Sequence, residues 1–362
     1  MDLLEQARQI INEVDGEMEK LFVRRMEAAK MVAEYKKQNG LPILDEVRES
    51  EIVRRNAERV EDSELREYYV NFIQNNMKIS RAYQSRFLEG MRAAYCGTEG
   101  AFAHIATGKL FPSAQRIAYG NFADAYRAVE SGECDVAVLP VENSYNGEVG
   151  QVTDLMFSGS LYVNQMFDLA VSHDLLVKKG TDLSEIKTVI SHPQALGQCA
   201  NRIQSAGWMT QEYPNTALAA KYVAESDDRT VAAIASEEAA EVFGLEVLER
   251  NLNASRSNTT RFAVFSRAEN RHPSGNMNSR FILVFTVRNE AGALARAVDV
   301  VGRYGFNMHC LRSRPMKELL WNYYFYLEAE GDIRTREGED MMRALSVFCD
   351  RLKLVGSYTI SE

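Results

Sequence analysis

Two threonines and an arginine stand at the start of a short apolar run near residue 260. The stretch TTRFAVF begins with Thr259, Thr260 and Arg261, and the four residues that follow are all apolar. That pattern predicts a strand that is covered on both faces. Threonine at such a position often only begins the strand or caps a turn. The alternative is that the Thr260 hydroxyl faces a site, where it holds or passes a proton.

Other segments also place glycine, hydroxyl and amide residues beside apolar runs. Residues 96–106 join glycines to a helix start, where free backbone N–H groups can receive a carboxylate. Residues 139–150 and 191–199 follow predicted strands and contain Asn, Ser and Gln. Each segment alone is typical of a turn. The first lacks the GxGxxG spacing, so a nicotinamide enzyme is not supported.

The first 90 residues have a helical composition, being rich in Glu, Arg, Met, Ala and Leu. The apolar spacing predicts helices at about 3–38, 45–59 and 63–90, with Gly40 and Pro42 ending the first. We therefore expect an all-α unit.

Polar side chains interrupt the apolar face of each predicted helix. Arg25 falls at a position whose heptad neighbours are apolar, and Lys36 lies about 20° from it around the axis. The other helices place Asp45, Arg48, Glu49, Ser80 and Gln84 in the same way. A lone arginine there usually extends to solvent, but polar groups on three helices favour a pocket for an anion with hydroxyls. Arg8 is rotated about 100° from Arg25, so it would serve a neighbouring subunit's pocket in an antiparallel dimer.

The composition is that of a folded protein with several domains. At 362 residues, 46% hydrophobic and 26% charged, the chain can form two or three domains. A net charge of −9 argues against a nucleic-acid partner, and without an apolar run of about 18 residues we expect no membrane span. The 5 cysteines form no CxxC pair and the histidines show no ligand spacing, so neither a disulfide framework nor a metal is expected. A cytoplasmic location fits best.

Two further patterns follow the helical segment. Strands alternate with helices from about residue 93 to 265, which predicts an α/β domain with a largely parallel sheet. Ligands bind at the carboxyl ends of parallel strands, yet Thr260 begins its strand, so we expect that strand to run antiparallel to its neighbours. Residues 266–279 are predicted to form a linker. The pattern of the remaining residues predicts strands and helices in the order βαββαβ, which is the ferredoxin-like order.

The helical segment resembles the helical chorismate mutase family in the order and spacing of Arg8, Asp15, residues 24–37, Pro42, residues 45–49, Ser80 and Gln84. The resemblance implies an intertwined dimer in which the partner subunit's Arg8 joins Asp45, Arg48 and Ser80 in binding chorismate. It makes Arg25, Lys36, Gln84 and Glu49 the catalytic residues. The rearrangement to prephenate needs a compact substrate and stabilised charge on the breaking ether oxygen. Arginines would grip the carboxylates, while Lys36 and Gln84 donate to that oxygen.

The middle segment resembles the prephenate dehydratase family in its glycine-rich first loop, ENS (142–144), SHPQ and QC (191–199), and TRF (260–262). Gly97 and Thr98 stand where that family has Gly-Pro. The resemblance implies two α/β lobes, similar to a type 2 periplasmic binding protein, closing on a cleft without a cofactor. It makes Thr260 the proton donor and places Asn143, Ser191, Gln198 and Arg261 on the substrate.

The last segment resembles the ACT regulatory domain. Gly292, Ala293 and Leu294 match one of its motifs, and Ser313, Arg314 and Pro315 match the second, although Arg312 replaces the usual glutamate. The resemblance implies an allosteric phenylalanine site formed by those six residues. The alternative is a ferredoxin-like dimerisation module that binds no ligand.

The sequence thus predicts a multidomain chain: an all-α bundle at 1–90, a two-lobed α/β domain at 92–268 and an α+β ferredoxin-like domain at 279–362. The resemblances imply conversion of chorismate to prephenate and then to phenylpyruvate, CO2 and water, with feedback by phenylalanine, in a homodimer or higher oligomer. One alternative is a regulatory protein with the same folds that binds a carboxylate metabolite without turnover. Another is a helical dimerisation module without catalysis.

Overall fold

The computed structural model describes residues 2–253, 258–269, 279–316 and 322–359. It divides into two compact units, Met1–Arg92 and Ala93–Glu362. Most of the predicted linker, residues 270–278, lies outside the described residues.

The first unit consists of the three predicted helices, α1 (Leu3–Gln38), α2 (Glu46–Ala57) and α3 (Ser63–Glu89). An aspartate caps each N-terminus by accepting from backbone N–H groups of the first turn. Helices α1 and α3 run side by side in the same direction, because Arg25 contacts Ser80 and Lys30 lies over the Phe87 ring. The predicted positions of these helices are confirmed.

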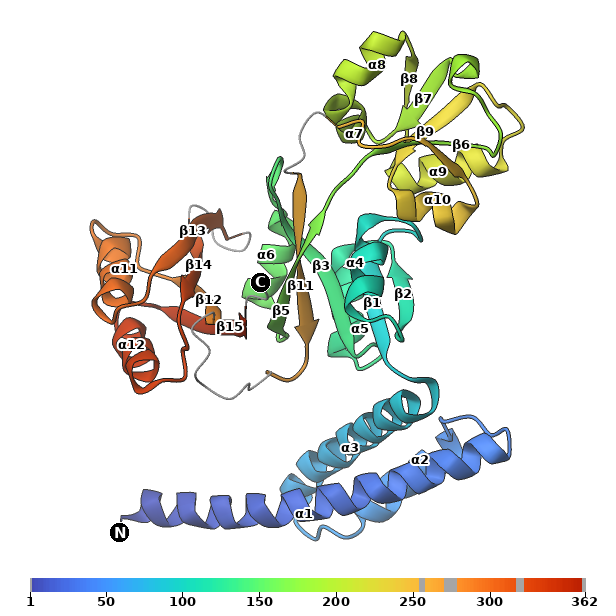
Figure 1. Ribbon diagram of the computed structural model, residues 1–362. Coiled ribbons are helices and arrows are strands. Elements are labelled where there is room, and N and C mark those ends of the chain that lie inside the picture. Colours follow the sequence, from blue (N-terminus) through green and yellow to red (C-terminus); the bar gives the residue numbers. More distant parts are fainter. Residues whose placement is uncertain (1, 254–257, 270–278, 317–321, 360–362) are drawn as a thin grey trace. The chain divides into compact units, whose positions relative to one another are not determined.

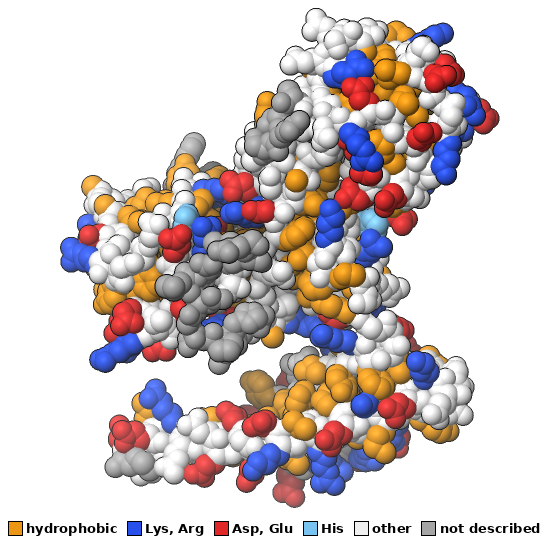
Figure 2. Space-filling view, viewed as in Figure 1, with side chains coloured by type: hydrophobic (Ala, Val, Ile, Leu, Met, Phe, Trp, Pro, Cys, Tyr) orange, Lys and Arg blue, Asp and Glu red, His pale blue; other side chains and the backbone are white. Residues whose placement is uncertain are grey.

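The apolar face of α1 is exposed along much of its length in the single chain. Ile11, Met18 and Val32, the heptad neighbours of Arg25, are 57%, 42% and 45% exposed. Hydrophobic side chains form a patch on this unit (Figure 2). The predicted burial of this face is therefore absent within one chain.

The second unit contains two α/β lobes, each with its own sheet (Figure 1). The first sheet has the order β2 (Gln115–Tyr119), β1 (Arg92–Cys96), β3 (Val136–Asn143), β11 (Thr259–Ser266) and β5 (Tyr162–Ala170), with β4 (Gly147–Glu148) beside β3. Its helices are α4 (Phe102–Leu110), α5 (Phe122–Glu130) and α6 (Gly150–Ser158).

The second sheet has the order β10 (Glu246–Glu249), β6 (Asp174–Val177), β9 (Val231–Ala235), β7 (Thr188–Ser191) and β8 (Met209–Glu212). Its helices are α7 (Pro193–Gln198), α8 (Ala200–Ala206), α9 (Thr216–Glu225) and α10 (Glu237–Phe243), with a 3-10 turn η1 (Leu183–Glu185). The chain passes between the lobes twice, from β5 to β6 and from β10 to β11. A two-lobed α/β domain was predicted and is observed.

Strand β11 runs antiparallel to both β3 and β5, which confirms the prediction from Thr260. The predicted largely parallel sheet is found in part: β1 pairs parallel with β3, and β7 with β8 and β9, but β11 runs against both of its neighbours. Strands β6 and β10 also pair antiparallel to their neighbours. Strands β6 and β10 lie where the chain passes between the lobes, and nothing in their local sequence pattern indicates their direction.

The terminal part of the second unit has the predicted βαββαβ order and forms a sheet β13 (Met308–Pro315), β14 (Tyr323–Glu330), β12 (Ser279–Thr286), β15 (Arg351–Thr359). Helices α11 (Ala293–Arg303) and α12 (Arg336–Ser346) cover one face, over Phe281 and Leu283. The alternate residues Ile282 and Val284 pack on the opposite face, in the same core as Met156 of the first lobe. The terminal sheet is thus packed against the lobe that carries β11.

Within the described residues, no helix is long and apolar enough to cross a membrane.

Candidate functional site

A cavity of about 330 Å³ in the second unit collects several of the predicted polar residues. Its lining includes Phe102, Asn143, His173, Gln198, Asn258 and Thr260. Phe102 is the first residue of α4, so the glycine-rich loop does bring a helix N-terminus to this cavity. Asn143 ends β3 and pairs directly with Thr260 on β11.

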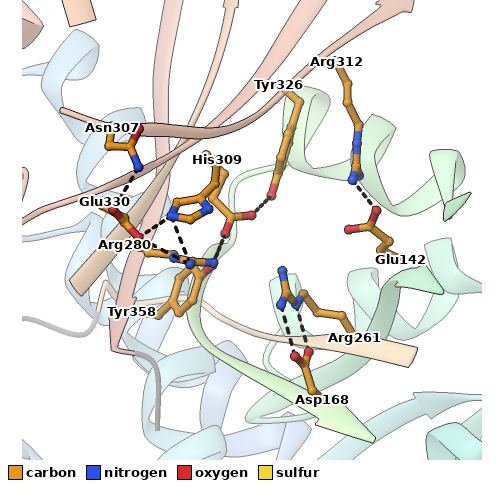
Figure 3. A network of polar contacts seen from close by, with 11 residues as sticks. Glu142, Asp168, Arg261, Arg280, Asn307, His309, Arg312, Tyr326, Glu330 and Tyr358 are labelled. Atoms are coloured by element: carbon orange, nitrogen blue, oxygen red, sulfur yellow. Dashed lines mark hydrogen bonds and ion pairs between the residues drawn. The ribbon is translucent and has the colours of Figure 1, made fainter. Parts of the chain in front are cut away.

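The alternation of β11 decides which residues reach the cavity. Asn258 and Thr260, two positions apart, both line it, whereas Arg261 does not. Arg261 instead donates from Nε and Nη2 to the Asp168 carboxylate, at 2.8 and 3.1 Å (Figure 3). That bond raises the pKa of Arg261 above its ordinary value. The predicted substrate contact of Arg261 is therefore not found, because its side chain lies on the other face of the strand.

Asn143 has a defined orientation. The backbone N–H groups of Tyr145 and Asn146 both donate to Asn143 Oδ1, each at 3.0 Å. Because a backbone N–H can only donate, Nδ2 must point the other way. It donates to Asn258 Oδ1 at 2.9 Å and to Thr260 Oγ1 at 3.0 Å. The Thr260 oxygen is thus an acceptor toward Asn143, which leaves its own proton free to point elsewhere.

The same reasoning fixes the hydrogen-bond directions of the next side chains along the cavity. Asn258 Nδ2 donates to Gln198 Oε1 at 2.9 Å, and His173 Nε2 lies 2.8 Å from that oxygen. Because a carbonyl oxygen only accepts, His173 carries its proton on Nε2. Gln198 Nε2 and His173 Nδ1 are buried, and among the described residues neither has a hydrogen-bond partner. A donor and an acceptor at the cavity wall are therefore unsatisfied.

Two of these residues were not predicted from the sequence. Asn258 could have been found, because it lies two positions before Thr260 and so shares its face. His173 follows the end of β5 with no distinctive spacing. Burial lowers the pKa of His173 below 6.5, although the bond to Gln198 and the charge of Asp174 act in the opposite direction. Burial therefore favours the neutral form of the His173 ring.

Ser191 was also predicted to contact substrate, and the structure places it elsewhere. It is fully buried, and its hydroxyl donates to the Ile234 carbonyl at 2.5 Å, joining β7 to β9. The hydroxyl is thus engaged within the sheet. Its neighbour His192 lines the cavity instead.

The helical unit brings several of its predicted residues together. Arg25 donates to the Ser80 hydroxyl and, at 3.2 Å, to the Asn76 carbonyl. Burial lowers the pKa of Arg25. Ser80 and Gln84 are buried on α3, and Gln84 Oε1 has no hydrogen-bond partner among the described residues.

The remaining predicted mutase residues lie at the ends and edges of this unit. Glu49 pairs with Arg81 of α3, and Lys36 Nζ donates to the Ile43 carbonyl at 2.6 Å. Asp45 caps α2 by accepting from Arg48 N–H at 2.9 Å. The Arg48 side chain is half exposed beside Glu51, and Arg8 is exposed on α1. One chain therefore does not bring Arg8 to the Arg25 cluster.

The two terminal motifs lie at the same end of the last sheet. Thr286, near the Gly292 turn, pairs with Tyr324, which pairs in turn with Arg314. Gly292 has φ 79°, a left-handed conformation that suits glycine, and it caps α11, which begins with Ala293 and Leu294. Ser313 and Pro315 flank Arg314 at the end of β13.

Comparisons with known proteins match the helical unit and the second unit to separate families. The family model described as chorismate mutase type II matches residues 7–85, and that described as prephenate dehydratase matches residues 93–270. A bifunctional chorismate mutase/prephenate dehydratase of Neisseria gonorrhoeae is 30% identical over 370 residues, covering 99% of this chain and 97% of that protein.

Two solved structures resemble the second unit. A prephenate dehydratase from Arthrobacter aurescens in complex with L-Phe is 26% identical, with a TM-score of 0.69, and the match covers 75% of this chain and 90% of that one. GqqA, described as a novel type of quorum quenching acylase, is 30% identical with a TM-score of 0.69, covering 74% and 98%. With near-complete coverage of the gonococcal relative at 30% identity, and with one family model on each unit, this chain belongs to the family of bifunctional chorismate mutase/prephenate dehydratases.

Proposed function

We propose that the helical unit converts chorismate to prephenate and that the cavity of the second unit converts prephenate to phenylpyruvate, CO2 and water. The observation that carries the second assignment is the ordered hydrogen-bond chain that leaves the Thr260 proton free at the cavity. We divide the chain into domains at 1–90, 92–268 and 279–362, and we assign it to the cytoplasm.

The helical unit suits a reaction that needs no acid, base or cofactor. Chorismate rearranges within one molecule, so the enzyme has only to hold the compact conformer and stabilise charge on the breaking ether oxygen. Arg25, with its hydrogen bonds to Ser80 and Asn76, is already oriented to receive a carboxylate. Lys36 and Gln84 are assigned to the ether oxygen and Glu49 to the ring hydroxyl.

We assign Arg8 to a neighbouring subunit's site, with Asp45, Arg48 and Ser80 contributing from the same chain as Arg25. Support comes from the apolar face of α1, whose exposed residues include Ile11 and Met18. A second copy of this helix would cover them in a homodimer. Sedimentation at micromolar concentration measures this directly, and a monomer would contradict the assignment.

The dehydratase step requires one proton. Prephenate loses its ring carboxylate as CO2, and the electron pair released makes the ring aromatic as the C–OH bond breaks. The departing hydroxyl takes a proton and leaves as water, so the products balance as phenylpyruvate, CO2 and water. Thr260 is placed to deliver this proton, because Asn143 donates to its oxygen and leaves its O–H for the substrate. A threonine hydroxyl is a weak acid, so it relays a proton rather than ionising.

The cavity supplies groups for the rest of prephenate. The α4 N-terminus at Phe102 presents backbone N–H groups suited to a carboxylate. Gln198 also lines the cavity and is assigned to the substrate.

We further propose that the terminal domain is an ACT domain that binds phenylalanine as a feedback inhibitor. The proposed residues are Gly292, Ala293, Leu294, Ser313, Arg314 and Pro315. The support is their placement at one end of the sheet. The Arthrobacter aurescens structure contains L-Phe.

Two rival functions are separated by one experiment. One alternative is acyl hydrolysis, which the description of GqqA suggests. The other is binding of a metabolite without turnover, which the two-lobed fold would permit. The dehydratase is favoured because the same chain carries the unit that would make its substrate.

In the experiment that separates these functions, purified chain is given prephenate, and the formation of phenylpyruvate is followed by absorbance. Thr260→Val should abolish its formation and leave chorismate turnover unchanged, while Thr210→Val, at an exposed position of β8, should change neither. Absence of phenylpyruvate from the unaltered chain would contradict the proposal.

A further inference from the structure

One segment of the second unit forms a wall of the cavity and also contacts the terminal sheet. It runs from Glu142, at the end of β3, to Gly159, just after α6. Its first half lines the cavity through Asn143, Glu148 and Val149 among others. Its second half is α6, whose residues are not among those that line the cavity.

Arg314 of β13 holds the start of α6. Its Nε donates to Asp154 Oδ1 at 2.9 Å, and its Nη1 lies 3.6 Å from Glu148 Oε2. The guanidinium occupies the space that a Cβ on Gly150 would need, so a larger residue at the start of α6 would have to displace the Arg314 side chain. Tyr324 OH also donates to Asp154 Oδ1, at 2.7 Å. A residue of the terminal sheet thus contacts both α6 and a residue of the cavity wall.

The end of α6 is held by the neighbouring strand β15. Lys353 Nζ donates to the Met156 carbonyl at 2.8 Å and to the Gly159 carbonyl, and Arg351 donates to the Phe157 carbonyl at 2.9 Å. These carbonyls have no partner within the helix, and the negative end of its dipole favours cations. Burial lowers the pKa of Lys353 to about 8. The Phe157 ring stacks on Tyr324 with 4.3 Å between centroids.

A third contact reaches the first residue of the segment. Arg312 of β13 pairs with Glu142, which directly precedes Asn143 (Figure 3). Figure 3 shows that this pair is separate from the Arg261–Asp168 pair. Arg312 stands where the ACT motif usually has a glutamate, so this contact depends on the departure of this chain from the motif.

We propose that Arg314 is a positioning residue for the dehydratase reaction. It holds Glu148 and α6, and through them the cavity wall that includes Asn143, in the arrangement that orients Thr260. Arg312, Arg351 and Lys353 hold the same segment at its two ends. The terminal sheet is therefore part of the support of the dehydratase cavity, in addition to any ligand that it binds. This inference rests on the proposed dehydratase activity.

The test uses both activities of the full chain. Arg314→Gln is expected to lower dehydratase kcat about tenfold with less change in KM, because the reacting groups are displaced while binding groups remain. Mutase turnover in the same sample should be unchanged and serves as the control for folding and concentration. Arg314→Lys, which keeps the charge, should recover part of the loss. Arg343→Gln, at an exposed arginine of α12, is the matched control and should have no effect.

A second variant tests whether the effect passes through Asp154. Asp154→Asn alone should lower dehydratase kcat, and the double variant Arg314→Gln/Asp154→Asn should be no slower than Arg314→Gln. Arg314→Gln activity within twofold of the unaltered chain, or losses that multiply in the double variant, would overturn the inference. If the unaltered chain makes no phenylpyruvate, the proposed function fails instead, so the two failures are distinguishable.

Discussion

The two candidate sites of this chain are built from different kinds of side chain. In the helical unit the predicted residues are mostly charged and contact other groups of the unit, as Arg25 does with Ser80 and Glu49 with Arg81. In the second unit Glu148 lines the cavity, but the hydrogen-bond chain along its wall consists of amides, an imidazole and a hydroxyl, each of which orients the next. The first site is suited to recognise its substrate by charge, the second by directed hydrogen bonds. Electrostatic and geometric perturbations should therefore affect them differently.

The largest effect is expected from removing a charge in the helical unit. Arg25→Ala should lower mutase kcat/KM by about 10²–10³, the usual cost of losing one preorganised group that stabilises charge. Dehydratase activity on prephenate should stay unchanged in the same preparation. Arg24→Ala, at the exposed neighbouring position, is the control. An equal loss in both variants would mean that general stability of α1, and not the site, is affected.

A change of hydrogen-bond direction should have the next largest effect. Asn143→Asp keeps the size of the side chain but removes the donor to Thr260, so the threonine proton would turn toward the carboxylate. Dehydratase kcat should fall by about 10², and mutase turnover should not change. Asn201→Asp, at an exposed residue of α8, adds the same charge elsewhere. Retention of full activity in Asn143→Asp would contradict the assigned direction.

Raising the salt concentration should lower the two activities by different factors, and this effect should be smaller than those of the two substitutions. The screening length falls from about 10 Å at 0.1 M to about 3 Å at 1 M ionic strength. We expect mutase kcat/KM to fall severalfold over this range and dehydratase kcat/KM to fall less. Both are measured on one preparation with chorismate and prephenate. An equal decline would remove the distinction between the sites.

The smallest effect concerns the protonation of His173. Burial holds its folded-state pKa below the ordinary 6.5. As the pH falls from 6.5, the unfolded chain binds this proton before the folded chain does, so this residue makes stability decrease with acidification. NMR titration of the ring should show a midpoint below 6.5. Gln198→Leu removes a bond that raises the pKa, and should move the midpoint lower still. A midpoint above 6.5 would contradict the buried, neutral ring.

The sequence predicted most elements because their patterns are local. The helices of the first unit, the βαββαβ order and the antiparallel β11 follow from periodicity and from Thr260 at a strand start. The reversed strand of the second lobe could not be predicted, since the return of the chain between lobes is set by contacts distant in sequence. Asn143, Gln198 and Thr260, which the family resemblance nominated, line one cavity. Arg261 was assigned to the substrate by the same resemblance, although the alternation of β11 puts it on the face opposite Thr260.

The two acidic contacts of Arg314 have a consequence for any ligand that binds the same side chain. The Arg314 guanidinium donates from Nε to Asp154, and its Nη1 lies 3.6 Å from Glu148, so its positive charge already faces two acids. An amino acid whose carboxylate binds this guanidinium would compete with those two acids for its charge. Binding of an amino acid to the terminal domain and loosening of the cavity wall would then be coupled directly, through the Arg314 side chain alone.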